Sequence, residues 1–190
     1  MSLLILGLVL FLGMHSVVIV APGARGQAIA RVGAGGWKAI HGMVSLLGLI
    51  LIAYGFGMAR LEPPVLYSPP DWLRLVAVIL MLPVFPLLFA AYLPGRIRRA
   101  AKHPMLAAIK VWAFAHLLAN GLLADVLLFG GFLAWAVAVR ISLKRRAATL
   151  AVSAKPGPWN DVIAVILGLG AYALTLSWAH LRFFGVSPLG

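Results

Sequence analysis

The sequence contains no cysteine. This absence excludes disulfide bonds, cysteine-held iron–sulfur clusters, thiolate ligands to haem and covalent haem attachment through a C-x-x-C-H motif. Any metal centre must therefore use histidine, carboxylate or main-chain ligands.

Charged residues are also scarce. They make up 11% of the chain, whereas a soluble domain has about 25%. Only 4 residues are acidic against 16 basic ones, which gives a net charge of +12. This charge does not indicate nucleic-acid binding, because the basic residues fall in loops between apolar runs. Attraction to the anionic headgroups of a lipid bilayer explains it more simply.

Long apolar runs dominate the rest of the chain, which is 63% hydrophobic. A helix needs roughly 20 apolar residues to cross a bilayer. The sequence predicts an all-α, polytopic integral membrane protein, a bundle of six transmembrane helices forming a single membrane domain over residues 1–190. The first run has neither a basic region before it nor an A-x-A cleavage site, so we expect it to be retained. The six predicted spans are 2–20, 37–59, 72–93, 104–119, 122–141 and 160–184.

The basic residues set the predicted orientation. Three of them (Arg60, Arg74 and Arg182) fall on one side, and Lys110 lies within a span. By the positive-inside rule, the more basic side is cytoplasmic, so both termini are extracytoplasmic. The residues predicted on the cytoplasmic side are Arg25, Arg31, Lys38, Arg96, Arg98, Arg99, Lys102, Arg140, Lys144, Arg145, Arg146 and Lys155.

Prolines and glycines mark the helix boundaries. Pro104 suits a first helical position, and Asn120-Gly121 suits the end of that helix. Pro83 and Pro86 lie inside the third span, where they should kink the helix and free carbonyls that neighbours can satisfy.

Glycine pairs predict close helix contacts. Gly130-Gly131 and Gly168-x-Gly170 lie within the fifth and sixth spans, and small residues are usual where membrane helices meet.

Five histidines occur in this apolar chain, and their depths differ. His116 is about 18 Å into its span, at about 1.5 Å per residue, and His15 is the other deep one. Neutral imidazole is a good ligand for iron, copper or zinc, so two facing imidazoles could hold a b-type haem. The other interpretation is that each histidine donates to a carbonyl of a neighbouring helix. His41 and His103, nearer the cytoplasmic edge, are alternative ligands.

Other polar residues could support such a site. Asn120 lies on the same helical face as His116, and it or Asp125 could orient the imidazole. Lys110 either extends to the interface or binds an anion such as a haem propionate. Arg96 and Arg99, with Arg98, either form a solvated face or contact a propionate or phosphate.

The sequence resembles the NnrU family of bacterial membrane proteins over its whole length. The resemblance is carried by FLGMHS (Phe11–Ser16), IVAPG (Ile19–Gly23), GGWK (Gly35–Lys38), MVSLLGL (Met43–Leu49), SPPDW (Ser68–Trp72), AAYLPGRI (Ala90–Ile97), KHPML (Lys102–Leu106), AHLLANG (Ala115–Gly121), LLFGGFLAWAV (Leu127–Val137) and FGVSPLG (Phe184–Gly190).

This resemblance implies a multi-pass protein of the bacterial inner membrane, linked to denitrification and nitric oxide metabolism. The family is similar to plant 15-cis-zeta-carotene isomerase, an integral membrane protein with a b-type haem. The ligand motifs of that relative match His15-Ser16 and Ala115-His116, so resemblance and depth select the same pair. The relative's cysteine near its second haem histidine has no counterpart here.

Three functions remain open at this stage. The first is a haem b protein, with His15 and His116 holding iron for electron transfer, for isomerisation of a lipophilic polyene or for nitric oxide handling; as an enzyme it would be an isomerase or oxidoreductase. The second is a membrane methyltransferase, since Lys102-His103-Pro104 resembles the R-H-P motif of isoprenylcysteine methyltransferases. Their glutamate-rich segment is missing, with Lys144-Arg145-Arg146 further along instead. The third is a non-catalytic accessory protein of a respiratory or denitrification complex.

Overall fold

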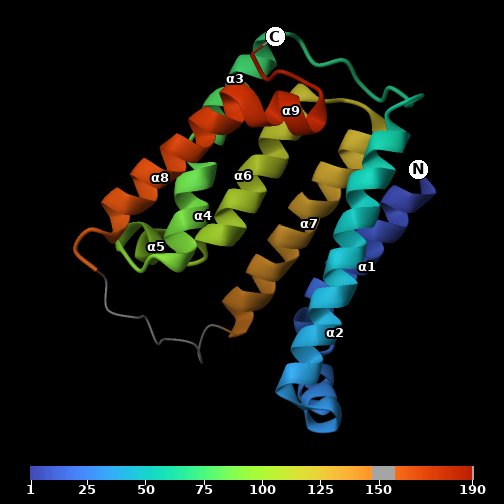
Figure 1. Cartoon of the computed structure of the whole chain (residues 1–190), viewed down its shortest axis with the longest axis vertical. Helices are drawn as coiled ribbons and strands as arrows, with labels where there is room; N and C mark the ends of the chain where they lie inside the picture. The colour runs from blue at the N-terminus through green and yellow to red at the C-terminus, as the bar shows by residue number, and fades with distance from the viewer. Residues whose placement is uncertain (147–156, 190) are drawn as a thin grey trace. The chain divides into compact units, whose positions relative to one another are not determined.

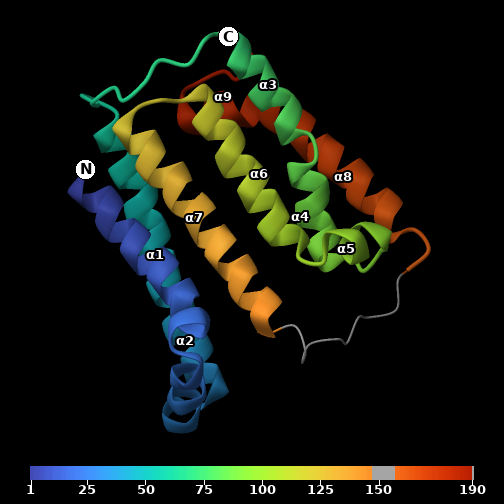
Figure 2. The same cartoon turned by 180° about the vertical axis from the view of Figure 1, so that it is seen from behind.

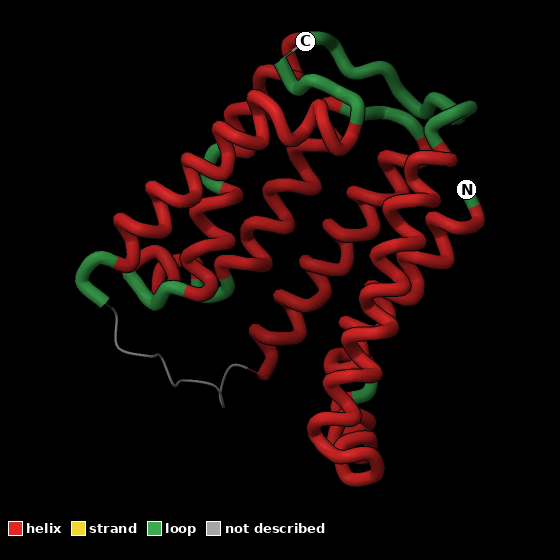
Figure 3. Tube along the Cα trace, viewed as in Figure 1, coloured by secondary structure: helices red, strands yellow, loops and turns green. Residues whose placement is uncertain are grey.

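The regular elements of the protein are helices (Figure 1). The structure, a computed structural model, describes residues 1–146 and 157–189. Lys155, predicted on the cytoplasmic side, lies outside the described residues. Within those residues, β-type pairing is limited to one isolated bridge between Val65 and Leu122. The all-α prediction is confirmed, as the red helices and green connections of Figure 3 show.

Most of the predicted spans correspond to long apolar helices. Five stretches of the described residues are long and apolar enough to cross a membrane. The remaining predicted span, Pro104–Ala119, is apolar but has 16 residues. The five stretches are Ser2–Val20, Gly23–Ala59, Trp72–Tyr92, Leu123–Arg145 and Asn160–Phe184.

The chain divides into two compact units. The first contains Met1–Tyr67 and Leu122–Leu143, and the second contains Ser68–Gly121 and Lys144–Gly190. Each unit is described separately below.

The first unit is organised around helices α1 (Ser2–Val20) and α2 (Pro22–Ala59), which run side by side (Figures 1 and 2). Glycines on both helices allow a close approach. A Cβ added at Gly48 of α2 would lie 2.8 Å from the backbone nitrogen of Phe11 in α1, and Gly7 and Gly55 meet the partner backbone in the same way. Small residues at such positions let two backbones approach closely in a membrane.

Helix α2 starts much earlier than the predicted span 37–59. Residues 22–36, which the sequence predicts as a loop, are helical, and the helix is interrupted only at Gly33. Gly33 has φ 76° and ψ 164°, a conformation available essentially only to glycine. The kink separates a short basic segment, residues 22–32, from the apolar part of α2.

Helix α7 (Leu123–Arg146) completes the first unit. Phe129 contacts Phe56 of α2, with ring centroids 6.3 Å apart. A Cβ on Gly131 would lie 3.7 Å from Leu12 of α1, an ordinary van der Waals contact, and Gly130 meets only its own helix, so neither glycine makes an approach that excludes a side chain.

The second unit consists of shorter helices. Their bounds are α3 Trp72–Met81, α4 Val84–Tyr92, α5 Arg96–Ala101, α6 Pro104–Ala119, α8 Asn160–Leu174, the π-helical turn η2 Thr175–Ala179 and α9 His180–Phe184. Helix α6 begins at Pro104 and ends before Asn120, as predicted.

The third predicted span is broken at Pro83, between α3 and α4. The backbone N–H of Leu82 donates to Ile79 at 3.2 Å instead of to Val78, four residues before it. The carbonyl of Val78 accepts a hydrogen bond from the Tyr172 hydroxyl of α8, at 2.7 Å. The predicted kink is therefore confirmed, and a neighbouring helix satisfies a freed carbonyl.

A second contact fixes α4 against α8. A Cβ on Gly168 would overlap the backbone of Pro86, so this glycine makes the close contact that the sequence predicts. Gly170 has open space around it, so the prediction was wrong for that residue.

Candidate functional site

His15 lies on the face of α1 that packs against α2. Gly7, Phe11 and His15 are spaced four residues apart and share that face. The ring of His15 stacks on that of Phe11, with centroids 4.3 Å apart. Its Nδ1 donates to the carbonyl of Phe11 at 2.7 Å. Since a carbonyl can only accept, Nδ1 carries the proton and Nε2 carries the lone pair.

His41 of α2 is the second histidine of the first unit and lies beside His15. Their centroids are 5.0 Å apart and their planes meet at 67°. Trp37, one turn before His41, lies 6.1 Å from it, and Trp135 of α7 lies 6.1 Å from His15 at 89°. Three helices therefore contribute aromatic rings to one cluster around His15.

Two buried polar atoms belong to the same helix faces. The Nε1 of Trp135 and the hydroxyl of Ser45, one turn after His41, have no hydrogen-bond partner among the residues that the structure describes. Buried donors normally have a hydrogen-bond partner. A buried donor without one destabilises the folded protein by about 1–3 kcal/mol. This cluster is therefore suited to a polar ligand.

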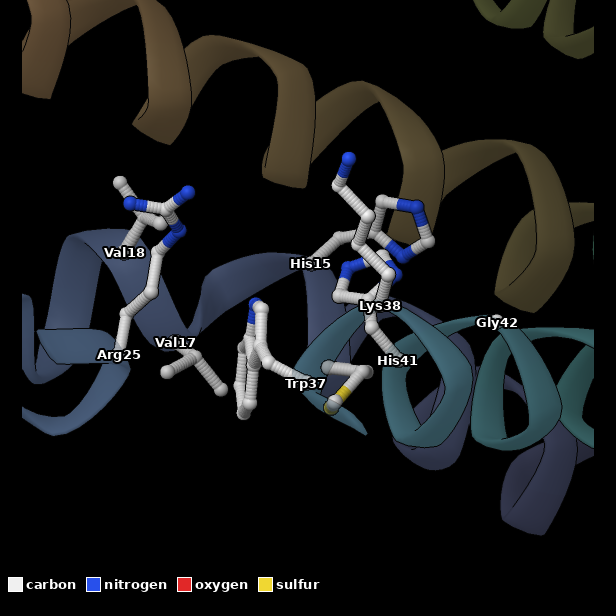
Figure 4. A pocket seen from close by; sticks show the side chains of 9 residues that line it. His15, Val17, Val18, Arg25, Trp37, Lys38, His41 and Gly42 are labelled. Atoms are coloured by element: carbon white, nitrogen blue, oxygen red, sulfur yellow. The ribbon is translucent and has the colours of Figure 1, made fainter. Parts of the chain in front are cut away.

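A pocket of about 340 Å³ opens beside these histidines (Figure 4). The kink at Gly33 places Arg25, before it, on the same pocket as Trp37 and Lys38, after it. Figure 4 shows the charged ends of Arg25 and Lys38 and the indole of Trp37 pointing to the same side.

His116 and His180 form the corresponding pair in the second unit. Nδ1 of His116 donates to the carbonyl of Trp112 at 2.8 Å, so Nε2 again carries the lone pair. The ring of His180 lies 6.4 Å from that of His116, with the planes 21° apart. Nδ1 of His180 donates to the carbonyl of Val186 at 2.7 Å.

The local backbone explains the position of His180. The π-helical turn η2 directly precedes it, and such turns shift the register of the residues that follow. Gly185 then ends α9 in the left-handed conformation, with φ 70°, and the chain returns so that Val186 reaches the imidazole.

The sequence predicted that Asn120 or Asp125 could orient the imidazole of His116. In the structure, Nδ1 of His116 donates to the main-chain carbonyl of Trp112. The Asn120 amide donates to the carbonyl of His116 at 2.9 Å. Asp125 is buried and accepts from the backbone N–H of Leu122 at 3.2 Å, within the first unit.

Two of the basic residues predicted near a cofactor, Arg96 and Arg99, lie close to Asp161. The carboxylate of Asp161 accepts from the backbone N–H groups of Arg96, at 2.7 Å, and Ile97, at 3.0 Å. Its charge also attracts the guanidinium groups of Arg96 and Arg99. Lys110 is half-buried on α6.

The alternative ligand His103 caps the start of α6. Its backbone N–H donates to Ala101 at 2.6 Å, and its carbonyl accepts from Ala107 at 3.1 Å. Its position is that of a helix-capping residue.

The structure thus brings His15 together with His41, and His116 together with His180, while His15 and His116 belong to different units. Among the described residues there is no group of three or more His, Cys, Asp or Glu suited to a metal ion.

Sequence reasoning missed Arg25 and His180 as site residues. Arg25 lines the pocket because of the kink at Gly33, and the G-A-G-G run (33–36) was the feature of the sequence that could have predicted this kink. For His180, depth argued against the residue, and nothing in the sequence shows the π-helical turn.

Comparison with known proteins gives one match. A model of the family described as NnrU protein matches residues 3–188, nearly the whole chain. No curated protein and no solved structure matches it.

Proposed function

Since the chain belongs to the NnrU family, we propose that it is a bacterial inner-membrane protein that binds haem b through transmembrane histidines. The candidates for the iron ligands are His15 in the first unit and His116 in the second, each judged within its own unit.

One observation carries this proposal. In both histidines, Nδ1 donates to the carbonyl four residues earlier in the same helix. This bond fixes the tautomer and the ring orientation, so Nε2, which carries the lone pair, would be the ligating atom. Metal-bound histidines almost always have their other ring nitrogen held in this way. The donor chemistry therefore fits haem iron.

Haem iron would supply a one-electron redox couple. Each of His15 and His116 would supply an imidazole ligand from its own unit. The resemblance to the plant isomerase favours redox-controlled isomerisation of a lipophilic polyene or electron transfer. The link to nitric oxide and denitrification rests on the resemblance alone.

The same proposal includes the topology. Helix α6 would be a sixth, short span that thins the bilayer locally or leans on its neighbours, and both termini would be extracytoplasmic.

The test is absorption spectroscopy of protein purified in mild detergent from cells supplied with a haem precursor. We expect a Soret band and sharp α and β bands after dithionite reduction, with haem b identified by pyridine haemochrome. His15→Ala and His116→Ala should each lose most of the bound haem. The control is His103→Ala, which removes an imidazole from a capping position and should retain it.

Other outcomes select other functions. Haem loss in His41→Ala or His180→Ala, with His15→Ala unchanged, would move the ligands to those residues. A colourless protein that binds S-adenosylmethionine would favour the methyltransferase. A colourless protein whose histidine variants all remain functional would favour the accessory role.

A further inference from the structure

We propose that the pocket between α1 and the kinked start of α2 binds the phosphate headgroup of an anionic membrane lipid, through Arg25 and Lys38. His15, a proposed haem ligand, lines the same pocket, whereas the lipid phosphate would be bound by Arg25 and Lys38.

The pocket is built by the backbone. The kink at Gly33 redirects residues 22–32, so Arg25 and Lys38, 13 positions apart in sequence, line one cavity (Figure 4). The residues that line it include two permanent cations and two imidazoles but no carboxylate. A cavity with this lining favours an anion.

The two cations have complementary roles toward phosphate. An arginine guanidinium binds phosphate oxygens in a bidentate manner, and a lysine ammonium adds a mobile point charge. The indole N–H of Trp37, which points to the same side, is a third donor.

The surroundings indicate a lipid and not a free anion. Val17 and Val18 of α1 line the pocket, and Val18 is 47% exposed, which gives an acyl chain an apolar surface. Tryptophan is enriched at the headgroup level of bilayers. Arg25 itself lies on a short exposed helix before the kink, as in interfacial segments.

The size of the cavity favours a headgroup. Pockets for drug-sized ligands measure about 300–1,000 Å³, and this one has about 340 Å³. It would enclose a phosphate and a glycerol unit, with the acyl chains outside along α1.

The test measures lipid binding to the purified full-length protein by native mass spectrometry. Dioleoyl phosphatidylglycerol is titrated against dioleoyl phosphatidylcholine at fixed ionic strength. We expect the wild-type protein to prefer phosphatidylglycerol. The double variant Arg25→Gln/Lys38→Gln should bind phosphatidylglycerol about 30-fold more weakly, from the usual contribution of a basic residue near anionic lipid.

A charge-matched control separates the pocket from the general basicity of the chain. Arg31→Gln/Arg98→Gln removes two exposed cations that do not line the pocket, and it should bind phosphatidylglycerol as the wild type does. Equal losses in the two double variants, or no loss in the pocket variant, would overturn the proposal. Helix content and gel-filtration profiles show that each variant is folded.

Two further measurements distinguish a lipid headgroup from other anions. Inorganic phosphate should fail to displace the lipid at equal concentration, because it lacks acyl chains; complete displacement would assign the pocket to a free anion instead. The intensity of the Soret band in the same variants tests whether Arg25 and Lys38 bind the propionates of haem instead. Lost haem with unchanged lipid binding would reassign Arg25 and Lys38 to a haem carboxylate and overturn the lipid site.

Discussion

At the scale of single residues, Tyr172 shows how a proline break is stabilised in an apolar environment. Pro83 cannot continue the helical hydrogen bonding, and the Tyr172 hydroxyl donates to the carbonyl of Val78. An unsatisfied carbonyl inside a bilayer is costly. The residue is therefore part of the kink although it lies on another helix.

Replacing Tyr172 by phenylalanine tests this hydrogen bond. We expect Tyr172→Phe to lower the free energy of unfolding by about 0.6 kcal/mol, the average measured for hydrogen bonds between membrane helices, and by no more than about 1.7 kcal/mol, the largest value. Thermal unfolding in detergent, followed by circular dichroism, measures the change. The control Tyr54→Phe removes a hydroxyl from a residue that is 64% exposed and should have little effect. Equal stability of both variants would contradict the assigned role.

The sequence predicted residues that shape the backbone next to them. It did not predict residues that contact positions far away in the sequence. Pro83, Pro104 and Asn120 were predicted because proline geometry and helix-end preferences are local. The contact of Asp161 with the start of α5 spans more than 60 positions, and no local pattern reports it. The same reason explains why the pairing of His116 with His180 was not predicted.

At the scale of helices, the contact between α1 and α2 depends on glycine. Gly7, Gly48 and Gly55 leave no room for a side chain at the contact. This contact also places His15 beside His41, so the packing of the two helices sets the geometry of the candidate site.

A methyl group at Gly48 should separate the two helices. We expect Gly48→Ala to destabilise the protein by about 1–3 kcal/mol, the usual range for overpacking. Haem or lipid binding at the adjacent pocket should weaken in the same variant. The control is Gly57→Ala, which adds the same methyl group to α2 in open space. It should be neutral or stabilising, because alanine favours helix by about 1 kcal/mol over glycine. Thermal unfolding of both variants would disprove the packing role if Gly48→Ala were as stable as Gly57→Ala.

The start of α2 could not be predicted from its composition. Residues 22–36 contain glycines and two arginines, which indicate a loop between spans. The structure shows a helix with one kink. Gly33, in a conformation that glycine tolerates, provides the change of direction at that kink.

At the scale of the whole molecule, the membrane topology can be tested directly. The chain has no cysteine, so single introduced thiols have no background. Ser68→Cys is predicted outside, and Ala100→Cys and Lys144→Cys inside; all three positions are exposed. A membrane-impermeant maleimide should label only Ser68→Cys in spheroplasts and all three after permeabilisation.

The pair Ala100 and Lys144 tests whether α6 crosses the membrane. Helices α6 and α7 lie between them, and α7 is long and apolar enough to cross, so the two thiols share a side if α6 also crosses. Labelling of Lys144→Cys but not Ala100→Cys in spheroplasts would show that only one of the two helices crosses, and the six-span topology would be wrong. Hydropathy predicts five of the helices well because each has a long apolar run; α6, with 16 residues, is the case that length alone leaves open.

The two compact units are interleaved along the chain. During synthesis, the ribosome releases the first 67 residues, then the whole of 68–121, before α7 emerges to finish the first unit. The early helices must therefore wait in the membrane, partly unpacked, while other segments insert. No single cut of the gene yields a fragment that consists of one unit alone. Residues 1–143 contain the whole first unit together with 68–121, and residues 68–190 contain the whole second unit together with 122–143. Only co-expressed, separately translated segments could therefore rebuild one unit without part of the other.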